Sequence, residues 1–157
     1  MTNKLYALGT ALAVAIIAFS SSAWADESQA ARIPEGSWLI STSPPAPVGV
    51  ITFTRDGAVL GSRPPVVLPG AGPEFVSTGH GTWMQKANRE ITSTVLYLRS
   101  SLTAEFTGIT KVITTVSVMG KSDELSGTSI VEVHLADGTL LVSFQLPVRM
   151  TRIIAGN

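Results

Sequence analysis

The chain has no cysteine among its 157 residues and only two histidines. Without cysteine there can be no disulfides, thiolate metal sites, cysteine nucleophile or lipid anchor on cysteine. With two histidines a histidine-rich metal centre is not expected, and we predict neither a metal nor a cofactor. Charged residues make up only 14% of the chain, and eleven basic residues balance eleven acidic ones. A neutral chain has no strong field to attract nucleic acid, so we expect no nucleic-acid partner.

The first 25 residues have the features of a secretory signal peptide. Lys4 provides a positive start, and an apolar run follows at residues 5–19. Residues 23–25, Ala-Trp-Ala, place small side chains where a signal peptidase requires them. We therefore expect cleavage before Asp26 and export to the periplasm or out of the cell, with no stable membrane insertion afterwards. An uncleaved membrane anchor is the alternative.

The rest of the chain is long enough for one ordinary domain, which we place at residues 36–157 after a polar arm at 26–35. This part is rich in Val, Ile, Thr and Phe, and it lacks a persuasive helical period. Asp56-Gly57 and Asp137-Gly138 are typical of hairpins with type I′ turns, in which both central residues have positive φ. We expect strands at 36–43, 47–54, 58–62, 79–86, 90–100, 107–119, 124–135 and 139–153.

Eight strands joined in sequence predict an all-β fold, an eight-stranded antiparallel up-and-down β-barrel, because closure removes exposed sheet edges. A sandwich of two sheets is the alternative that the same signals allow. The last strand has the clearest sidedness, since its apolar residues alternate with polar ones. The residues expected to face the lumen are Leu140, Val142, Phe144, Leu146, Val148 and Met150 of this strand, with Val112, Val116 and Val118 of the sixth.

The outer surface is predicted to carry an apolar stripe. Lys111 lies on the face opposite the inward valines, and we expect it to lie across from Glu132 on the next strand. An exposed apolar stripe is either an interface between copies of a chain or scattered surface residues. We favour a homo-oligomer here. The stripe is expected to comprise Ile109, Ile113 and Ile130, to which Val95 and Tyr97 of neighbouring strands can add.

The connections of an up-and-down barrel fall alternately at its two ends. The second, fourth and sixth connections are short, and all lie at one end. The third connection, Arg63–Thr78, is long, rich in proline and glycine, and lies at the other end. A loop of this length is either a lid over a binding site or a rigid cover that seals apolar side chains from water. We therefore expect the barrel to be plugged at the end with short turns and open at the other.

Gly36-Ser37-Trp38 opens the first strand, and Arg152 lies near the end of the last. Both are expected at the plugged end, where the guanidinium can cover the indole. In these residues the chain resembles the calycin-type barrels, the lipocalins and their relatives, which carry Gly-x-Trp on strand one and a basic residue on the final strand. The layout of residues 36–153 also resembles the smaller barrels related to allene oxide cyclase. The resemblance implies a lumen that holds a small hydrophobic molecule.

Two titratable residues are candidates for catalysis at the open end. His80 stands between two glycines that leave space around its imidazole, and Glu105, or alternatively Glu74, could orient it as an acid–base pair. The alternative is a loop histidine that binds a backbone carbonyl. The candidate ligand-binding residues are Trp83, Met84, Phe106, Val116, Val133, Phe144 and Leu146, with Tyr97 as a further aromatic wall.

Three functions remain open at this point. The first is an exported barrel that binds a small hydrophobic or amphipathic molecule in a pocket of at least about a few hundred Å³. The second is a cofactor-independent cyclase or isomerase of the allene oxide cyclase-like type, which folds an apolar substrate into a reactive conformation. The third is a structural or assembly protein with a filled core. The volume and polarity of the lumen discriminate among them.

Overall fold

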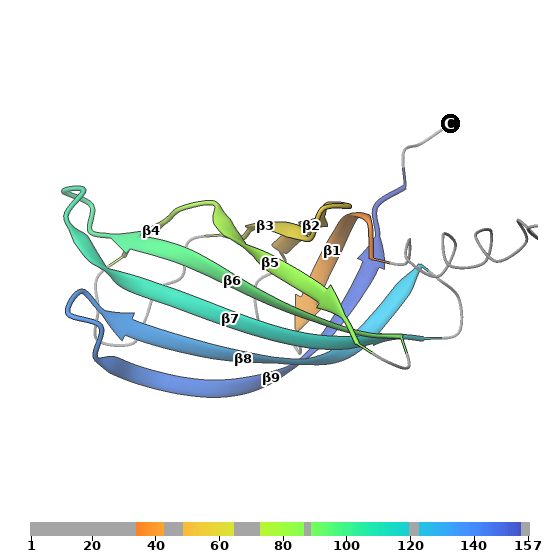
Figure 1. Cartoon of the computed structure of the whole chain (residues 1–157). Coiled ribbons are helices and arrows are strands. Elements are labelled where there is room, and N and C mark those ends of the chain that lie inside the picture. Colours follow the sequence, from red (N-terminus) through yellow and green to blue (C-terminus); the bar gives the residue numbers. More distant parts are fainter. Residues whose placement is uncertain (1–33, 43–48, 65–72, 87–88, 120–122, 155–157) are drawn as a thin grey trace, which may run out of the picture.

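The computed structural model describes residues 34–42, 49–64, 73–86, 89–119 and 123–154. The predicted signal peptide and most of the predicted arm lie outside these residues, as does the middle of the long third connection. The described residues form nine strands (Figure 1): β1 Gly36–Thr42, β2 Gly49–Phe53, β3 Ala58–Ser62, β4 Phe75–Val76, β5 Gly79–Gln85, β6 Glu90–Ser100, β7 Phe106–Val118, β8 Glu124–Leu135 and β9 Leu140–Arg152.

Eight of these strands close into an antiparallel barrel in sequential order. Each strand pairs with the next along the chain, and β1 pairs with β9 to complete the ring. The short β4 is not a separate member of the ring, because it pairs with the far end of β6 beyond β5. The predicted up-and-down barrel is therefore confirmed, and the alternative of a two-sheet sandwich is wrong. The predicted strand positions agree to within a few residues, except that β4 was not expected.

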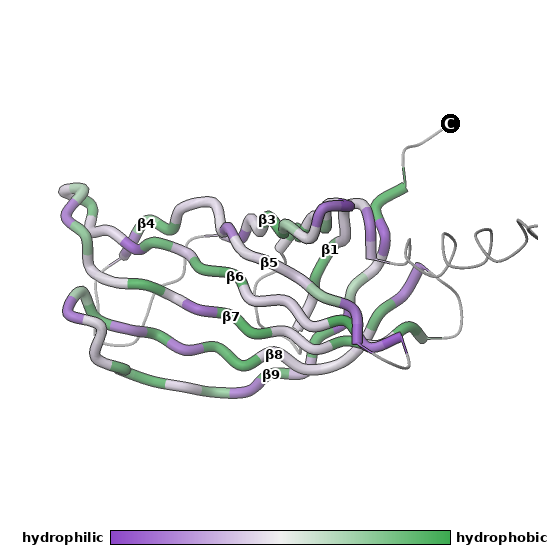
Figure 2. Tube along the Cα trace, viewed as in Figure 1, coloured by the Kyte–Doolittle hydropathy of each residue, from purple (hydrophilic) through white to green (hydrophobic). Residues whose placement is uncertain are grey.

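Hydrophobic and hydrophilic residues alternate along β7 and β8 (Figure 2), and the inward-facing side chains form the core. The predicted inward set on β7 is confirmed, because Val116 is buried while Val112 and Val118 pack against the core. On β9 the alternation holds from Val142 to Met150. It fails at Leu140, because a register shift next to Val133 pairs Leu140 with His134. The largest core cluster comprises Trp38, Ile51, Phe53, Val59, Ile91, Val95, Tyr97, Val116, Leu125, Val148 and Met150.

The outer face carries the predicted ion pair. Lys111 lies opposite Glu132 and donates a hydrogen bond to its carboxylate at 3.0 Å. This hydrogen bond is the main cause that holds the pKa of Glu132 below its ordinary value. Because both side chains are partly exposed, solvent screens the pair and it contributes little to stability.

The predicted apolar stripe is confirmed in part. Ile113 pairs directly with Ile130 on the face that Lys111 occupies. Val95 and Tyr97 do not belong to the stripe. Both are buried in the core, because odd-numbered residues of β6 face the lumen. Whether the stripe joins copies of the chain stays a prediction.

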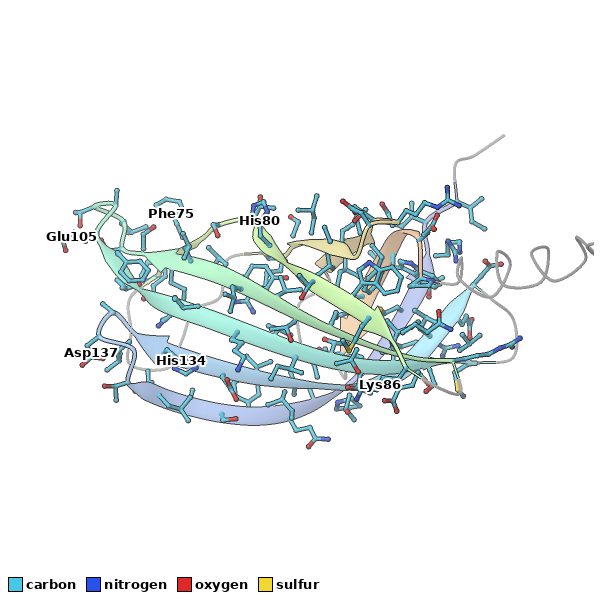
Figure 3. The ribbon with its side chains drawn as sticks, viewed as in Figure 1. Phe75, His80, Lys86, Glu105, His134 and Asp137 are labelled. Carbon is cyan, nitrogen blue, oxygen red and sulfur yellow. The ribbon has the colours of Figure 1, made fainter. Side chains whose placement is uncertain are left out.

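The two ends of the barrel differ as the order of connections predicts. At one end, Arg152 covers Trp38, with the guanidinium carbon 4.3 Å from the ring centroid. The turn after β7 meets this plug through Asp123, and Lys86 lies at the same end (Figure 3). The turns 101–105 and 136–139 lie at the opposite end of the long strands (Figure 1).

The two Asp-Gly turns are not of type I′. Gly57 and Gly138 have φ of 90° and 86°, but φ is not positive at the aspartate before either glycine. In the second turn Asp137 instead accepts a hydrogen bond from the backbone N–H of Thr139 at 2.8 Å. Aspartate bonded in this way stabilises a turn in which glycine alone needs positive φ.

Candidate functional site

The structure does not bring His80 and Glu105 together. His80 lies on the outer face of β5, exposed, between Leu60 and Leu96 of the neighbouring strands. Glu105 lies at the exposed tip of the turn between β6 and β7. Figure 3 shows His80 pointing away from the barrel and Glu105 at its far end. Neither side chain faces the lumen, so an acid–base pair over the lumen receives no support from their positions.

The predicted ligand-binding residues fall into two groups. Leu146, Val133 and Phe144 line cavities inside the barrel. The other four do not line these cavities. Met84 is exposed on the outer face of β5, and Phe106 is exposed at the start of β7. Trp83 faces inward, but it packs edge-on against Phe53 at 5.9 Å and donates its indole N–H to the carbonyl of Thr54. Val116 is fully buried in the core.

A cavity lined mainly by aliphatic side chains lies inside the barrel. Its volume is about 120 Å³, which is smaller than the few hundred Å³ expected from the sequence. It is close to the roughly 150 Å³ of an apolar cavity that can hold a benzene ring. Its walls come from seven strands, β1–β3 and β6–β9. The residues that line it include Ile40, Ile51, Val95, Tyr97, Val112, Val131, Leu146 and Val148, with Arg63 beyond β3.

The inner face remains apolar from this cavity toward the open end. Val142 and Phe144 face inward opposite Val133 and Val131, yet they are 40% and 41% exposed. Inward-facing residues this exposed are not covered by other described parts of the barrel. The described residues therefore seal the lumen beside Trp38 and leave it accessible to solvent toward the ends of the longest strands.

A second, smaller cavity of about 40 Å³ shares Arg63 and Val131 with the first, and its otherwise apolar lining includes the charged side chains of Glu74 and Arg99. Arg99, which is only 4% exposed, projects into it from the end of β6. Its guanidinium donates to the carboxylate of Glu74 at 2.8 Å and to the backbone carbonyl of His134 at 2.7 Å. Glu74, just before β4, is itself only 9% exposed. The pair is thus a buried ion pair inside the barrel.

Arg63 lines both cavities, and its guanidinium carbon lies 4.4 Å from the centroid of the Tyr97 ring. Burial lowers the pKa of Arg63, and the positive charge of Arg99 lowers it further. Burial likewise raises the pKa of the Tyr97 phenol, while Arg63 opposes that rise. Because arginine stays protonated in proteins and a raised pKa keeps the phenol neutral, the lumen holds a charged guanidinium on a neutral phenol at neutral pH.

Sequence reasoning missed Arg63 and Arg99 as lumen residues, although glycines gave a signal for both neighbourhoods. A Cβ at Gly61 would overlap the Tyr97 hydroxyl, and one at Gly79 would lie 2.5 Å from its ring. Gly108, with φ of 144°, lies directly opposite Arg99 and leaves room for its guanidinium. These glycines accommodate large inward side chains of β6. The space that Gly79 leaves on the inner face of β5 is therefore occupied by Tyr97.

Substituting Gly61 with alanine is expected to lower the free energy of unfolding by about 1–3 kcal/mol, because the new methyl group overlaps the Tyr97 hydroxyl. Tyr97→Phe removes that oxygen, after which the nearest ring carbon lies 3.1 Å from the methyl position. Gly61→Ala should therefore cost much less in the Tyr97→Phe background. Urea unfolding of the two single variants and the double variant measures this coupling. Equal costs in both backgrounds would show that Tyr97 does not occupy this space.

Within the described residues, no group of three or more His, Asp and Glu side chains could hold a metal ion. No helix in the same ranges is long and apolar enough to cross a bilayer.

Comparison of the chain with protein-family models, with curated proteins and with solved structures found no match. The basis for a proposed function is therefore the barrel and the residues that line its lumen.

Proposed function

We propose that this protein binds a small hydrophobic or amphipathic molecule in the lumen of its barrel. The observation that carries this proposal is the apolar cavity of about 120 Å³ inside the barrel, whose other end carries the contact between Trp38 and Arg152. The half-exposed inner face at Val142 and Phe144 gives a ligand a path from solvent. Burying a chain of methylene groups against such walls contributes about 0.8 kcal/mol per group before the costs of binding.

Two further parts of the proposal rest on the sequence. The predicted signal peptide favours a role outside the cytoplasm, in the periplasm or the medium. The pair of Trp38 and Arg152 supports a relationship to the calycin-type barrels, since the contact joins the two positions in which the chain resembles them. We favour ligand binding over the cyclase and the assembly role, because His80 and Glu105 do not converge on the lumen and the barrel interior is not completely filled.

Calorimetric titration with octan-1-ol tests the proposal. We expect a dissociation constant on the order of 0.1–1 mM for a ligand of this size. Val112 lines the cavity, and Val112→Phe should fill part of it and weaken binding about tenfold or more. The matched control is Ile113→Phe, because the next residue lies on the outer face opposite Ile130. The control should bind octan-1-ol like the unaltered protein.

Native mass spectrometry of the protein purified from its own host would identify the ligand class through a copurifying molecule. Two results would contradict the proposal: no heat of binding with octan-1-ol, or equal binding by Val112→Phe and Ile113→Phe. In the second case the alcohol would be bound outside the lumen.

A further inference from the structure

The open half of the lumen contains two arginines but only one carboxylate among the described residues. Arg99 is committed to Glu74 and to the carbonyl of His134, so its charge is balanced. Arg63 makes no ion pair or hydrogen bond within the described ranges, and its Nε is buried without a partner. One positive charge is therefore left over beside the apolar cavity.

Arg63 as a whole is half-buried, but its Nε is shielded from water, and shielding part of a cation without supplying an anion costs the folded protein free energy. The neighbouring charge of Arg99 adds repulsion. Tyr97 holds the guanidinium over its ring at 4.4 Å, which offsets part of the cost and restricts its position. Perturbed charged groups of this kind are concentrated at functional sites in proteins.

Arg63 also lies where the two cavities meet. With Val131 it lines both the larger apolar cavity and the smaller one, whose lining includes Glu74 and Arg99. A ligand that fills the apolar cavity would thus end with one group against the guanidinium. This arrangement fits a molecule that has an apolar body and a single charged end.

Resting on the proposed lumen function, we propose that the ligand is an amphipathic carboxylic acid whose carboxylate pairs with Arg63 and whose chain occupies the apolar cavity. The planar fork of a guanidinium matches a carboxylate in a bidentate pair. A monoanion neutralises the single surplus charge. A dianionic phosphate would instead leave negative charge close to the buried carboxylate of Glu74.

The test compares three probes with the same eight-carbon chain by calorimetric titration at pH 7: octanoate, octan-1-ol and octylammonium. The unaltered protein should bind octanoate about tenfold or more tightly than octan-1-ol, and octylammonium most weakly. Arg63→Met should remove the preference for octanoate while binding of octan-1-ol changes little. Arg63→Lys keeps the charge but loses the bidentate fork, and it should retain part of the preference. Arg149→Met is the matched control, because Arg149 lies exposed on the outer face of β9.

The outcomes separate this inference from the proposed function. Equal binding of octanoate and octan-1-ol by the unaltered protein, or a preference that survives in Arg63→Met, overturns the carboxylate site and leaves lumen binding intact. Failure of all three probes to bind overturns both. The comparison of probes needs no variant, so it decides the question even if Arg63→Met does not fold. Circular dichroism verifies the fold of each variant.

Discussion

Replacing Trp38 with alanine is expected to lower the free energy of unfolding by about 3–5 kcal/mol. The indole is fully buried, and it donates its N–H to the carbonyl of Pro34 at 2.9 Å. Its ring also supports Arg152, which in turn donates to the carbonyl of Glu35 at 2.6 Å and pairs with Asp123 at 3.2 Å. Alanine would leave a cavity at the closed end and remove the surface on which Arg152 rests. Urea unfolding followed by circular dichroism measures the loss.

The control for this prediction is Leu39→Ala on the same strand. Leu39 faces outward and is partly exposed, so its truncation should cost about 1 kcal/mol or less. If Trp38→Ala proves as stable as Leu39→Ala, the plug does not hold the barrel end together. A typical domain has only about 5–15 kcal/mol of stability in total, so the expected loss is a large part of it.

The sequence was sufficient to predict this closed end because the argument depends on strand order alone. In an up-and-down barrel with eight strands, the start of the first strand and the end of the last lie at the same end. Gly36-x-Trp38 and Arg152 are therefore brought together whatever the exact register of the strands between them. The 4.3 Å contact confirms that prediction. Turn positions were equally predictable, since Asp-Gly signals are local.

The inner face of β6 could not be predicted in the same way. Apolar residues occur at both odd and even positions of this strand, so their alternation does not show which set faces the lumen. Leu96 and Leu98 are 45% and 55% exposed, whereas Arg99 is 4% exposed. Arg99 faces inward because a carboxylate from the distant Glu74 reaches it there. A contact across 25 residues of sequence, to a loop rich in proline and glycine, leaves no periodic signal.

The surroundings of His80 differ from the prediction for a related reason. Glycines on either side of the histidine predict free space around its imidazole. In the barrel, Gly79 and Gly81 are the inward-facing residues, and His80 between them must then face outward. The glycines accommodate Tyr97 and the backbone at Thr94 instead. Only the register of β5 against β6 reveals which side chain needs the room.

The second large effect is expected from Glu74→Leu, which should lower the free energy of unfolding by about 3–5 kcal/mol. The substitution leaves Arg99 buried without its carboxylate, and it places two unbalanced guanidiniums in one lumen. Glu124→Leu is a matched control, because Glu124 pairs with Arg149 at a similar distance, 2.7 Å, but in solvent. Exposed pairs contribute about 0–1 kcal/mol, so the control should unfold almost like the unaltered protein.

A double variant, Glu74→Leu with Arg99→Met, separates two quantities. One is the loss of stability caused by a buried charge without a partner, and the other is the net contribution of the ion pair to stability. Replacing both partners of a buried ion pair by apolar side chains is often neutral or even stabilising, since neither charge then has to leave water. We therefore expect the double variant to be more stable than Glu74→Leu alone, with urea unfolding at pH 7 as the measurement. If Glu74→Leu instead costs no more than Glu124→Leu, water reaches Arg99 in the folded protein. The end of the lumen beside Arg99 would then be in contact with water. Water would screen the charge of Arg63, and the expected preference for an anionic ligand would be weaker.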